Sequence, residues 1–217
     1  MKDAVTPGSD TEPVSIRLVA TLGFAGLLSG LIIVSVFEAT LPTITEYKAK
    51  VLKEAVFKVL PGISSMQELA YRDGRMVEAT GDEEEEDKLF GGYDADGMLV
   101  GYAIPNAGPG FQDTIRLLYG YLPQERRVVG MEILQSRETP GLGDKIYKDA
   151  DFVANFSALS TEPQIVTVKK GTRSAANEVD AITGATISSK AVVQIINRGN
   201  QRWNPRLDAS PIPPGAE

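Results

Sequence analysis

The order of apolar and polar residues separates one long apolar run from a series of shorter patterns. Residues 18–37 read LVATLGFAGLLSGLIIVSVF and carry no charge, and Arg17 and Glu38 bound them. A helix needs roughly 20 apolar residues to cross a bilayer, whereas the apolar part of a cleaved signal peptide is usually about 7–15 residues long. We therefore expect a retained transmembrane anchor over residues 15–38, after a polar, disordered tail over residues 1–14.

After the anchor, helical and strand periodicities follow one another. Residues 43–60 have apolar positions at helical spacing and end at Pro61-Gly62, which predicts an amphipathic connecting helix within residues 39–62. The sequences RDGR (72–75) and DADG (94–97) predict hairpin turns. We expect strands at residues 89–93, 98–104, 115–121, 128–134 and 165–168, and short helices at residues 149–159 and 189–200.

These elements predict an α+β fold. One N-terminal transmembrane helix is followed by a single soluble domain over residues 63–203, in which helices flank an antiparallel sheet. Residues 204–217 contain four prolines and are expected to form a proline-rich tail.

Composition narrows the chemistry of the chain. It contains no cysteine and no histidine, which excludes disulfides, thiolate catalysis, haem on histidine and the common zinc sites. The net charge of −7 argues against nucleic acid as a partner. The acidic run over residues 82–87 lacks the ligand spacing of a calcium loop and is interpreted as a solvated loop. We therefore expect neither a resident metal nor a catalytic acid–base pair.

The segment DAITGATISS, residues 180–189, places several hydroxyl groups before the predicted C-terminal helix. A helix N-terminus presents free backbone N–H groups and favours phosphate, and the small residues Gly184 and Ala185 let a large group approach the backbone. The same hydroxyl groups could equally cap the helix through Ser188 or Ser189 and form turns. The residues alone leave both interpretations open.

This segment resembles the D-x-x-[ST]-G-A-T-x-[ST] signature of the FMN-binding domain family. In that family the threonine after Gly-Ala carries FMN through a phosphoester bond, and the matching residue here is Thr186. The resemblance also implies a separate flavin transferase that takes the group from FAD and uses Mg²⁺. The remaining positions that match the signature are Asp180, Thr183, Gly184, Ala185 and Ser188.

A second stretch, SRETPGLGDK over residues 136–145, resembles the E-T-P-G-L-G loop of the same family. Its glycines would let the backbone lie close to a flat ring, although Pro-Gly is also common in ordinary surface turns. The loop at residues 108–112 is either a further wall of the flavin site or a plain loop. The resemblance implies the following additional FMN-binding residues: Glu138, Thr139, Gly141, Leu142, Gly143 and Lys145.

Together the two motifs resemble the G subunits of Rnf ion-translocating electron-transport complexes, with the related C subunits of Na⁺-translocating NADH:quinone reductase as the close alternative. The resemblance implies an electron carrier with covalent FMN and no independent turnover. It also implies a single pass through the inner membrane, a periplasmic soluble domain, and the other Rnf subunits as partners. Two other functions stay open: an anchored flavin reductase with its own substrate, and a non-redox tethered binding module.

Overall fold

The computed structural model describes residues 16–81, 83–84 and 87–210 of the chain. The predicted tail at residues 1–14, residues 211–217 of the predicted C-terminal tail, and part of the acidic run lie outside the described residues. The chain divides into two compact units, residues 1–49 and residues 50–217, and each is considered by itself.

The first unit holds most of helix α1, Ile16–Val59, whose apolar segment is a candidate membrane span by length and composition. No side chain of that apolar window is buried within the protein. The anchor and the connecting helix, expected as separate elements, form one continuous helix that includes Pro42. Proline removes one backbone donor from a helix. Beside it, the hydroxyl groups of Thr40 and Thr45 donate to the backbone carbonyls of Val36 and Leu41, at 2.8 and 2.9 Å.

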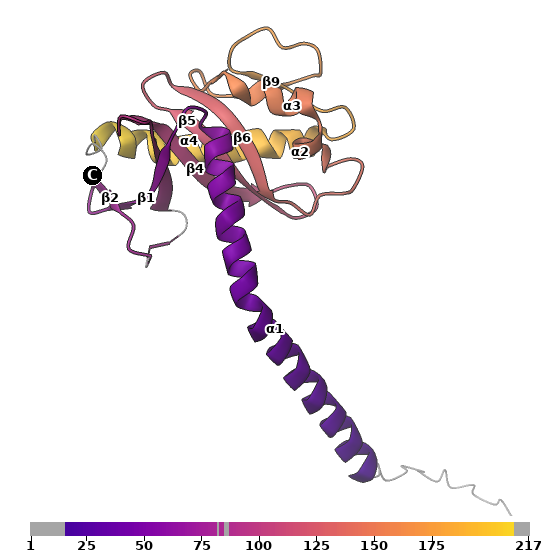
Figure 1. Ribbon diagram of the computed structural model, residues 1–217. Helices are drawn as coiled ribbons and strands as arrows, with labels where there is room; N and C mark the ends of the chain where they lie inside the picture. Colours follow the sequence, from indigo (N-terminus) through magenta and orange to yellow (C-terminus); the bar gives the residue numbers. More distant parts are fainter. Residues whose placement is uncertain (1–15, 82, 85–86, 211–217) are drawn as a thin grey trace, which may run out of the picture. The chain divides into compact units, whose positions relative to one another are not determined.

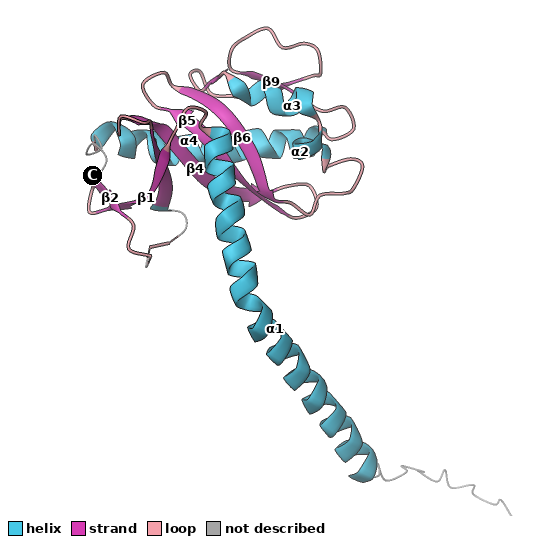
Figure 2. Ribbon diagram, in the orientation of Figure 1, coloured by secondary structure: helices cyan, strands magenta, loops and turns pink. Residues whose placement is uncertain are grey.

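The second unit is built on a seven-stranded antiparallel sheet in the order β2-β1-β3-β4-β5-β6-β7 (Figures 1 and 2). A separate parallel pair, β8 with β9, lies near the short helices. The predicted α+β architecture with an antiparallel sheet is confirmed. The strands are β1 Ser65–Arg72, β2 Arg75–Glu78, β3 Lys88–Tyr93, β4 Leu99–Pro109, β5 Thr114–Leu122, β6 Arg127–Gln135, β7 Leu159–Ser160, β8 Val166–Val168 and β9 Glu178–Asp180.

Both predicted hairpin turns are present. Asp73 and Gly74 have φ angles of 52° and 79°, the left-handed pair that a two-residue turn between β1 and β2 requires. In the second turn, Asp94 Oδ1 accepts hydrogen bonds from the backbone N–H groups of Asp96 and Met98, both at 2.9 Å. Strand β4 continues five residues beyond the predicted end at 104 because the pairing with β5 persists past Pro105.

Two hydrophobic clusters occupy the two faces of the sheet. On one face, strand residues such as Ile104 and Tyr119 pack with Ile195 and Trp203 of helix α4, Thr186–Ala209. On the other face, the end of α1 packs on Phe90, Ala103 and Leu118. Helix α4 is longer than the predicted 189–200: it continues through Pro205 because Trp203 and Leu207 remain buried in the core.

The end of α1 lies directly on strand backbone. A side-chain carbon added at Gly120 would collide with the carbonyl oxygen of Val59, and one added at Gly130 would fall 2.7 Å from the Val59 Cα. Two strands therefore carry glycine where the helix end makes contact, and a larger residue at either position would separate helix and sheet.

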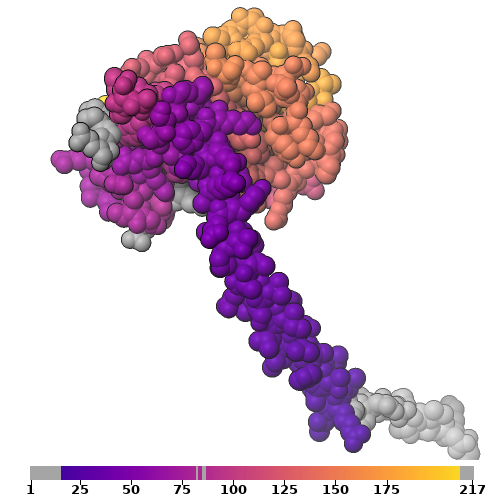
Figure 3. All heavy atoms as spheres, in the orientation of Figure 1, coloured from indigo at the N-terminus to yellow at the C-terminus, as the bar shows by residue number. Residues whose placement is uncertain are grey.

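Short helices gather at the β6 end of the sheet, where Figure 3 shows the orange segments packed together. They are α2 Lys145–Lys148, α3 Ala150–Ala154 and the 3₁₀ turn η2 Asn155–Ser157. The single helix predicted over residues 149–159 is thus α3 followed by η2, and it ends where Leu159 enters strand β7. Asp149 Oδ1 caps α3 by accepting from the backbone N–H groups of Asp151 and Phe152.

One residue of the acidic run is not solvated as predicted. The carboxylate of Glu83 accepts hydrogen bonds from the backbone N–H groups of Thr80 and Gly81, at 3.1 and 3.0 Å, and pairs with Arg72. Hydrogen bonding from the backbone at Thr80 lowers the pKa of Glu83 to about 2. The backbone of the turn and Arg72 thus satisfy this carboxylate.

Candidate functional site

A tight turn carries the chain from strand β9 into helix α4. The backbone N–H of Ala185 donates to the carbonyl of Ile182 at 3.0 Å, and Gly184 has a φ angle of 84°, which favours glycine. Thr183 and Thr186 are exposed on either side of the buried Ala185. The turn therefore presents the hydroxyl group of Thr186 at the first residue of α4.

The capping interpretation of the hydroxyl groups is wrong. No side chain hydrogen-bonds to the helix from the N-cap position, which Ala185 occupies. Ser189 instead accepts from the backbone N–H of Ile182 at 3.1 Å and donates to the carbonyl of Ala185 at 2.9 Å. Ser188 donates to the carboxylate of Glu138. The serines thus tie the turn to its surroundings. Among the described residues, the exposed hydroxyl of Thr186 has only a long contact with the Ile182 carbonyl, at 3.5 Å.

Glu138 joins three segments that are far apart in the sequence. Its Oε1 atom accepts from the backbone N–H groups of Phe111 and Gln112, both at 3.0 Å. Its Oε2 atom accepts from the hydroxyl of Ser188 at 2.5 Å. The residue is only 5% exposed. The structure therefore brings together both motifs and the loop at residues 108–112, with a buried carboxylate between them.

The pKa of Glu138 reflects two opposing influences. Burial raises it, but hydrogen bonds from Ser188 and from the backbone at Gln112, Asp113 and Phe111 outweigh burial and lower it below its ordinary value. The carboxylate is therefore charged at neutral pH, which strengthens each hydrogen bond that it accepts.

Glycine lets the second motif approach Glu138 and α4. A carbon added at Gly143 would fall 2.8 Å from Glu138 Oε2 and 3.1 Å from Ser188 Oγ. Leu142 Cδ2 lies 3.8 Å from the position that a side-chain carbon of Gly184 would take. The loop at residues 139–143 and the turn at residues 182–186 are therefore in direct contact.

The remaining residues of the second motif shape its turn. Thr139 donates from its hydroxyl to Gln112 Oε1 at 3.0 Å, and its carbonyl accepts from the backbone N–H of Leu142 at 3.2 Å. Gly141 has a φ angle of 78° and is exposed. The half-buried Lys145 begins α2, and its backbone N–H donates to the carbonyl of Leu142 at 3.2 Å.

Asp180, the first residue of the signature, hydrogen-bonds to the loop that contains Gly171 and Arg173. Its Oδ1 atom accepts from the backbone N–H groups of Gly171 and Arg173, at 2.9 and 3.2 Å. Its own N–H donates to Asn155 Oδ1 at 3.1 Å. Within the described part of the chain, its side chain makes no hydrogen bond to Thr186, so this aspartate supports the loop beside the turn.

Three exposed apolar side chains lie on the segments that Glu138 joins. Phe111, Leu142 and Ile187 are 64%, 50% and 58% exposed, and their backbones lie within the segments that Glu138 joins. Such residues suit a flat apolar ring, while the uncapped start of α4 and the Thr186 hydroxyl suit a phosphate. The residues present therefore fit a phosphorylated aromatic cofactor such as FMN.

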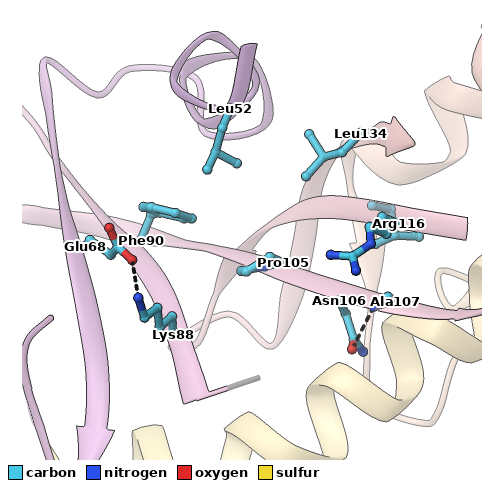
Figure 4. Close-up of a pocket in the computed structure, with 10 residues that line it drawn as sticks. Leu52, Glu68, Lys88, Phe90, Pro105, Asn106, Ala107, Arg116 and Leu134 are labelled. Atoms are coloured by element: carbon cyan, nitrogen blue, oxygen red, sulfur yellow. Dashed lines mark hydrogen bonds and ion pairs between the residues drawn. The ribbon is translucent and has the colours of Figure 1, made fainter. Parts of the chain in front are cut away.

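A separate cavity lies away from this site. It has a volume of about 380 Å³ and lies on the α1 side of the sheet, where Leu52, Phe90 and Leu134 turn toward it (Figure 4). At its edge, Lys88 Nζ pairs with Glu68 Oε1 at 3.3 Å. No residue predicted from the motifs lines it. Sequence reasoning missed this cavity because its apolar residues follow the same alternation as ordinary core positions.

Comparison with known proteins defines the class of this site. Residues 110–201, which contain both motifs and residues 110–112 of the adjacent loop, match the FMN-binding domain family. NqrC from Shewanella oneidensis has the same fold, with a TM-score of 0.58 at 17% identity over 76% of this chain and 100% of that one. The C subunit of the Na⁺-translocating NADH-quinone reductase from Parabacteroides distasonis gives a TM-score of 0.60 at 19% identity, over 78% and 96%.

Sequence relatives then identify the particular family. The G subunit of the Na⁺-translocating ferredoxin:NAD⁺ oxidoreductase complex from Acetobacterium woodii is 31% identical over 75% of this chain and 78% of its own length. The G subunit of the ion-translocating oxidoreductase complex from Methanosarcina acetivorans is 27% identical over 87% and 94%. The chain belongs to the family of G subunits of ion-translocating (Rnf) oxidoreductase complexes.

Proposed function

We propose that this chain is the electron-carrier subunit of a membrane-bound, ion-translocating ferredoxin:NAD oxidoreductase complex, and that it carries FMN on Thr186. The observation that carries the proposal is the exposed Thr186 hydroxyl at the uncapped start of α4, beside apolar side chains of the second motif. Family membership supports the partners, which are the other membrane and redox subunits of the complex.

Attachment would be a phosphoester transfer from FAD, catalysed by a separate flavin transferase that uses Mg²⁺. The Thr186 Oγ atom forms a bond to the phosphorus of the FMN half of FAD. The bond between that phosphorus and the oxygen that bridges to AMP breaks, AMP leaves, and the hydroxyl proton passes to solvent. No electrons are gained or lost, so loading needs no oxidant or reductant.

Each part of the site would then have a distinct task. Bound FMN supplies redox chemistry at its ring, and the protein holds and surrounds it. Thr186 holds the phosphate at the helix N-terminus, where backbone N–H groups favour an anion. Phe111, Leu142 and Ile187 give the ring apolar contacts and exclude water from part of it. Glu138 is buried, and its hydrogen bonds would hold these segments in position.

The apolar segment of α1 supports a membrane anchor. We propose that it spans the inner membrane once and that the soluble domain lies on the periplasmic face. Addition of a membrane-impermeant amine reagent to intact spheroplasts tests this. Labelling of the exposed Lys169 in intact spheroplasts supports the orientation, and labelling only after lysis contradicts it.

The attachment is tested by the intact mass of the full chain, produced in detergent with its flavin transferase. We expect the wild type to gain the mass of FMN less one water and Thr186→Val to gain nothing. Thr183→Val, which removes an exposed hydroxyl three residues away, is the matched control and should load fully. An unmodified wild type, or a loaded Thr186→Val variant, refutes the attachment. Turnover of a soluble donor by the loaded chain alone would favour a flavin reductase instead.

A further inference from the structure

The elements that build the Thr186 site are basic, although the chain has a net charge of −7. Residues 186–207 of α4 contain four basic residues and no acidic residue. In the loop at residues 136–148, the acidic residues Glu138 and Asp144 are both buried. The first accepts the hydrogen bonds described above, and the second pairs with Lys148 at 2.6 Å. The exposed charge next to Thr186 is therefore mainly positive.

Three cations of these elements, Lys145, Lys190 and Arg198, have no carboxylate partner among the residues that the structure describes. Most other basic side chains of this unit are neutralised within the protein. The paired residues are Lys58, Arg72, Lys88, Arg126, Arg127, Arg137, Lys148, Lys170 and Arg206. The unpaired positive charge is thus available to an external group.

The cations flank the apolar side chains of the site. Lys190 follows Thr186 by one helical turn, so both exposed residues lie on the same face of α4. Arg198 lies about 18 Å beyond Thr186 along the helix axis. Its guanidinium group lies against Gly108, where an added side-chain carbon would collide with the Nη2 atom. This contact links the helix to the loop that carries Phe111.

We propose that this face docks an acidic surface of the protein that exchanges electrons with the flavin. We call it the basic face and define it by Phe111, Leu142 and Ile187 at its centre and Lys145, Lys190 and Arg198 around them. The proposal rests on the proposed function, because the partner must approach the ring at Thr186. Apolar centres with charged rims are typical of protein interfaces.

Charge decides the kind of partner. Unpaired cations around a site attract an oppositely charged surface over long range and raise the rate of encounter by about 10- to 10³-fold at low ionic strength. Glu138 and Asp144 are buried, and the exposed Asp113 near Phe111 is paired with Arg137 at 3.6 Å, so these carboxylates oppose an acidic partner little.

The test uses the flavin-loaded full chain in its assembled complex and measures electron transfer through the complex at increasing KCl. We expect the wild-type rate to fall as salt rises. Arg198→Glu and Lys190→Glu should each be about 10-fold slower at low salt and should approach the wild-type rate at high salt. The matched control is Arg75→Glu, an exposed arginine of the β1–β2 turn without an ion pair among the described residues, which should follow the wild type.

Two results would overturn the inference. One is a loaded Arg198→Glu variant with the rate and salt dependence of the wild type. The other is an equal loss in Arg75→Glu, which would assign the effect to net charge. Intact mass separates this from the proposed function, because a wild type without FMN refutes the proposed function and the docking inference with it. If Arg198→Glu also disturbs the packing against Gly108, the result for Lys190→Glu decides the inference instead.

Discussion

The hydrogen bond between Ser188 and Glu138 gives a quantitative test of how the site is held together. Ser188 is 3% exposed and donates to a carboxylate that is 5% exposed. Ser188→Ala removes a charge-assisted hydrogen bond, and we expect it to lower the free energy of unfolding by about 1.5–3 kcal/mol. Glu138→Gln keeps the shape and an acceptor for the two backbone N–H groups, so it should cost less than truncation to alanine.

The assay is urea unfolding of the full chain in detergent, followed by the fluorescence of Trp203, the chain's single tryptophan, which α4 buries. The double variant Ser188→Ala/Glu138→Gln should lose less unfolding free energy than the sum of the losses in Ser188→Ala and Glu138→Gln, because both substitutions disrupt the same hydrogen bond. Ser157→Ala is the control: it removes an exposed hydroxyl that donates to the carbonyl of Ala154, and it should change stability by less than about 0.5 kcal/mol. A loss in Ser188→Ala no larger than in this control, or strictly additive losses, would refute the reasoning.

Three further outcomes follow from the same contacts. The pKa of Glu138 is lowered in the folded state, so its stabilisation is present above the unfolded pKa of about 4.3 and is lost as pH falls through the folded pKa. The difference in unfolding free energy between wild type and Glu138→Gln should therefore shrink in acid, and a constant difference contradicts this. Gly143→Ala should lower FMN loading, and should lower stability by about 1–3 kcal/mol, because its new carbon meets Glu138. The new carbon of Gly141→Ala meets open space, so that variant should lose only the roughly 1–2 kcal/mol of its left-handed backbone. Equal loading defects in the two variants would be inconsistent with the contact. Gly120→Ala should lower the melting temperature because its carbon would meet the Val59 carbonyl, and an unchanged melting temperature in calorimetry would show that the helix end moves freely.

Much of the fold was readable from local signals. The Asp-Gly pairs located both hairpins, and alternating apolar residues located most strands of the sheet. Strand β1, with the sequence SMQELAYR, has no regular alternation of apolar and polar residues, and it is identified by its pairing with β2 on one side and β3 on the other. The anchor predicted at residues 15–38 and the connecting helix predicted at residues 39–62 form one helix, because Pro42 is tolerated where neighbouring hydroxyl groups bond to the helix backbone.

The sequence predicted which segments form the site, but not the role of each residue in it. The hydroxyl-rich turn and the glycine loop were both located by their motifs. Neither motif shows that Glu138 is a buried link to Ser188, because the two residues are separated by 50 positions. Likewise, the position of Asp180 in the signature does not show that its side chain accepts hydrogen bonds from the backbone of Gly171 and Arg173. Roles that depend on tertiary contacts carry no local signal.

The uncapped start of α4 links maturation of the chain to its stability. A helix without a side-chain cap lacks about 0.5–2 kcal/mol that a capping oxygen would contribute. A phosphate on Thr186 would place anionic oxygens beside the first turn of the 24-residue helix that covers one face of the sheet. We therefore expect the loaded chain to unfold at a higher temperature than the unloaded one, which a paired melting experiment measures. Attachment of the prosthetic group would then complete the stabilisation of the folded chain, and a chain without FMN would be more susceptible to proteolysis.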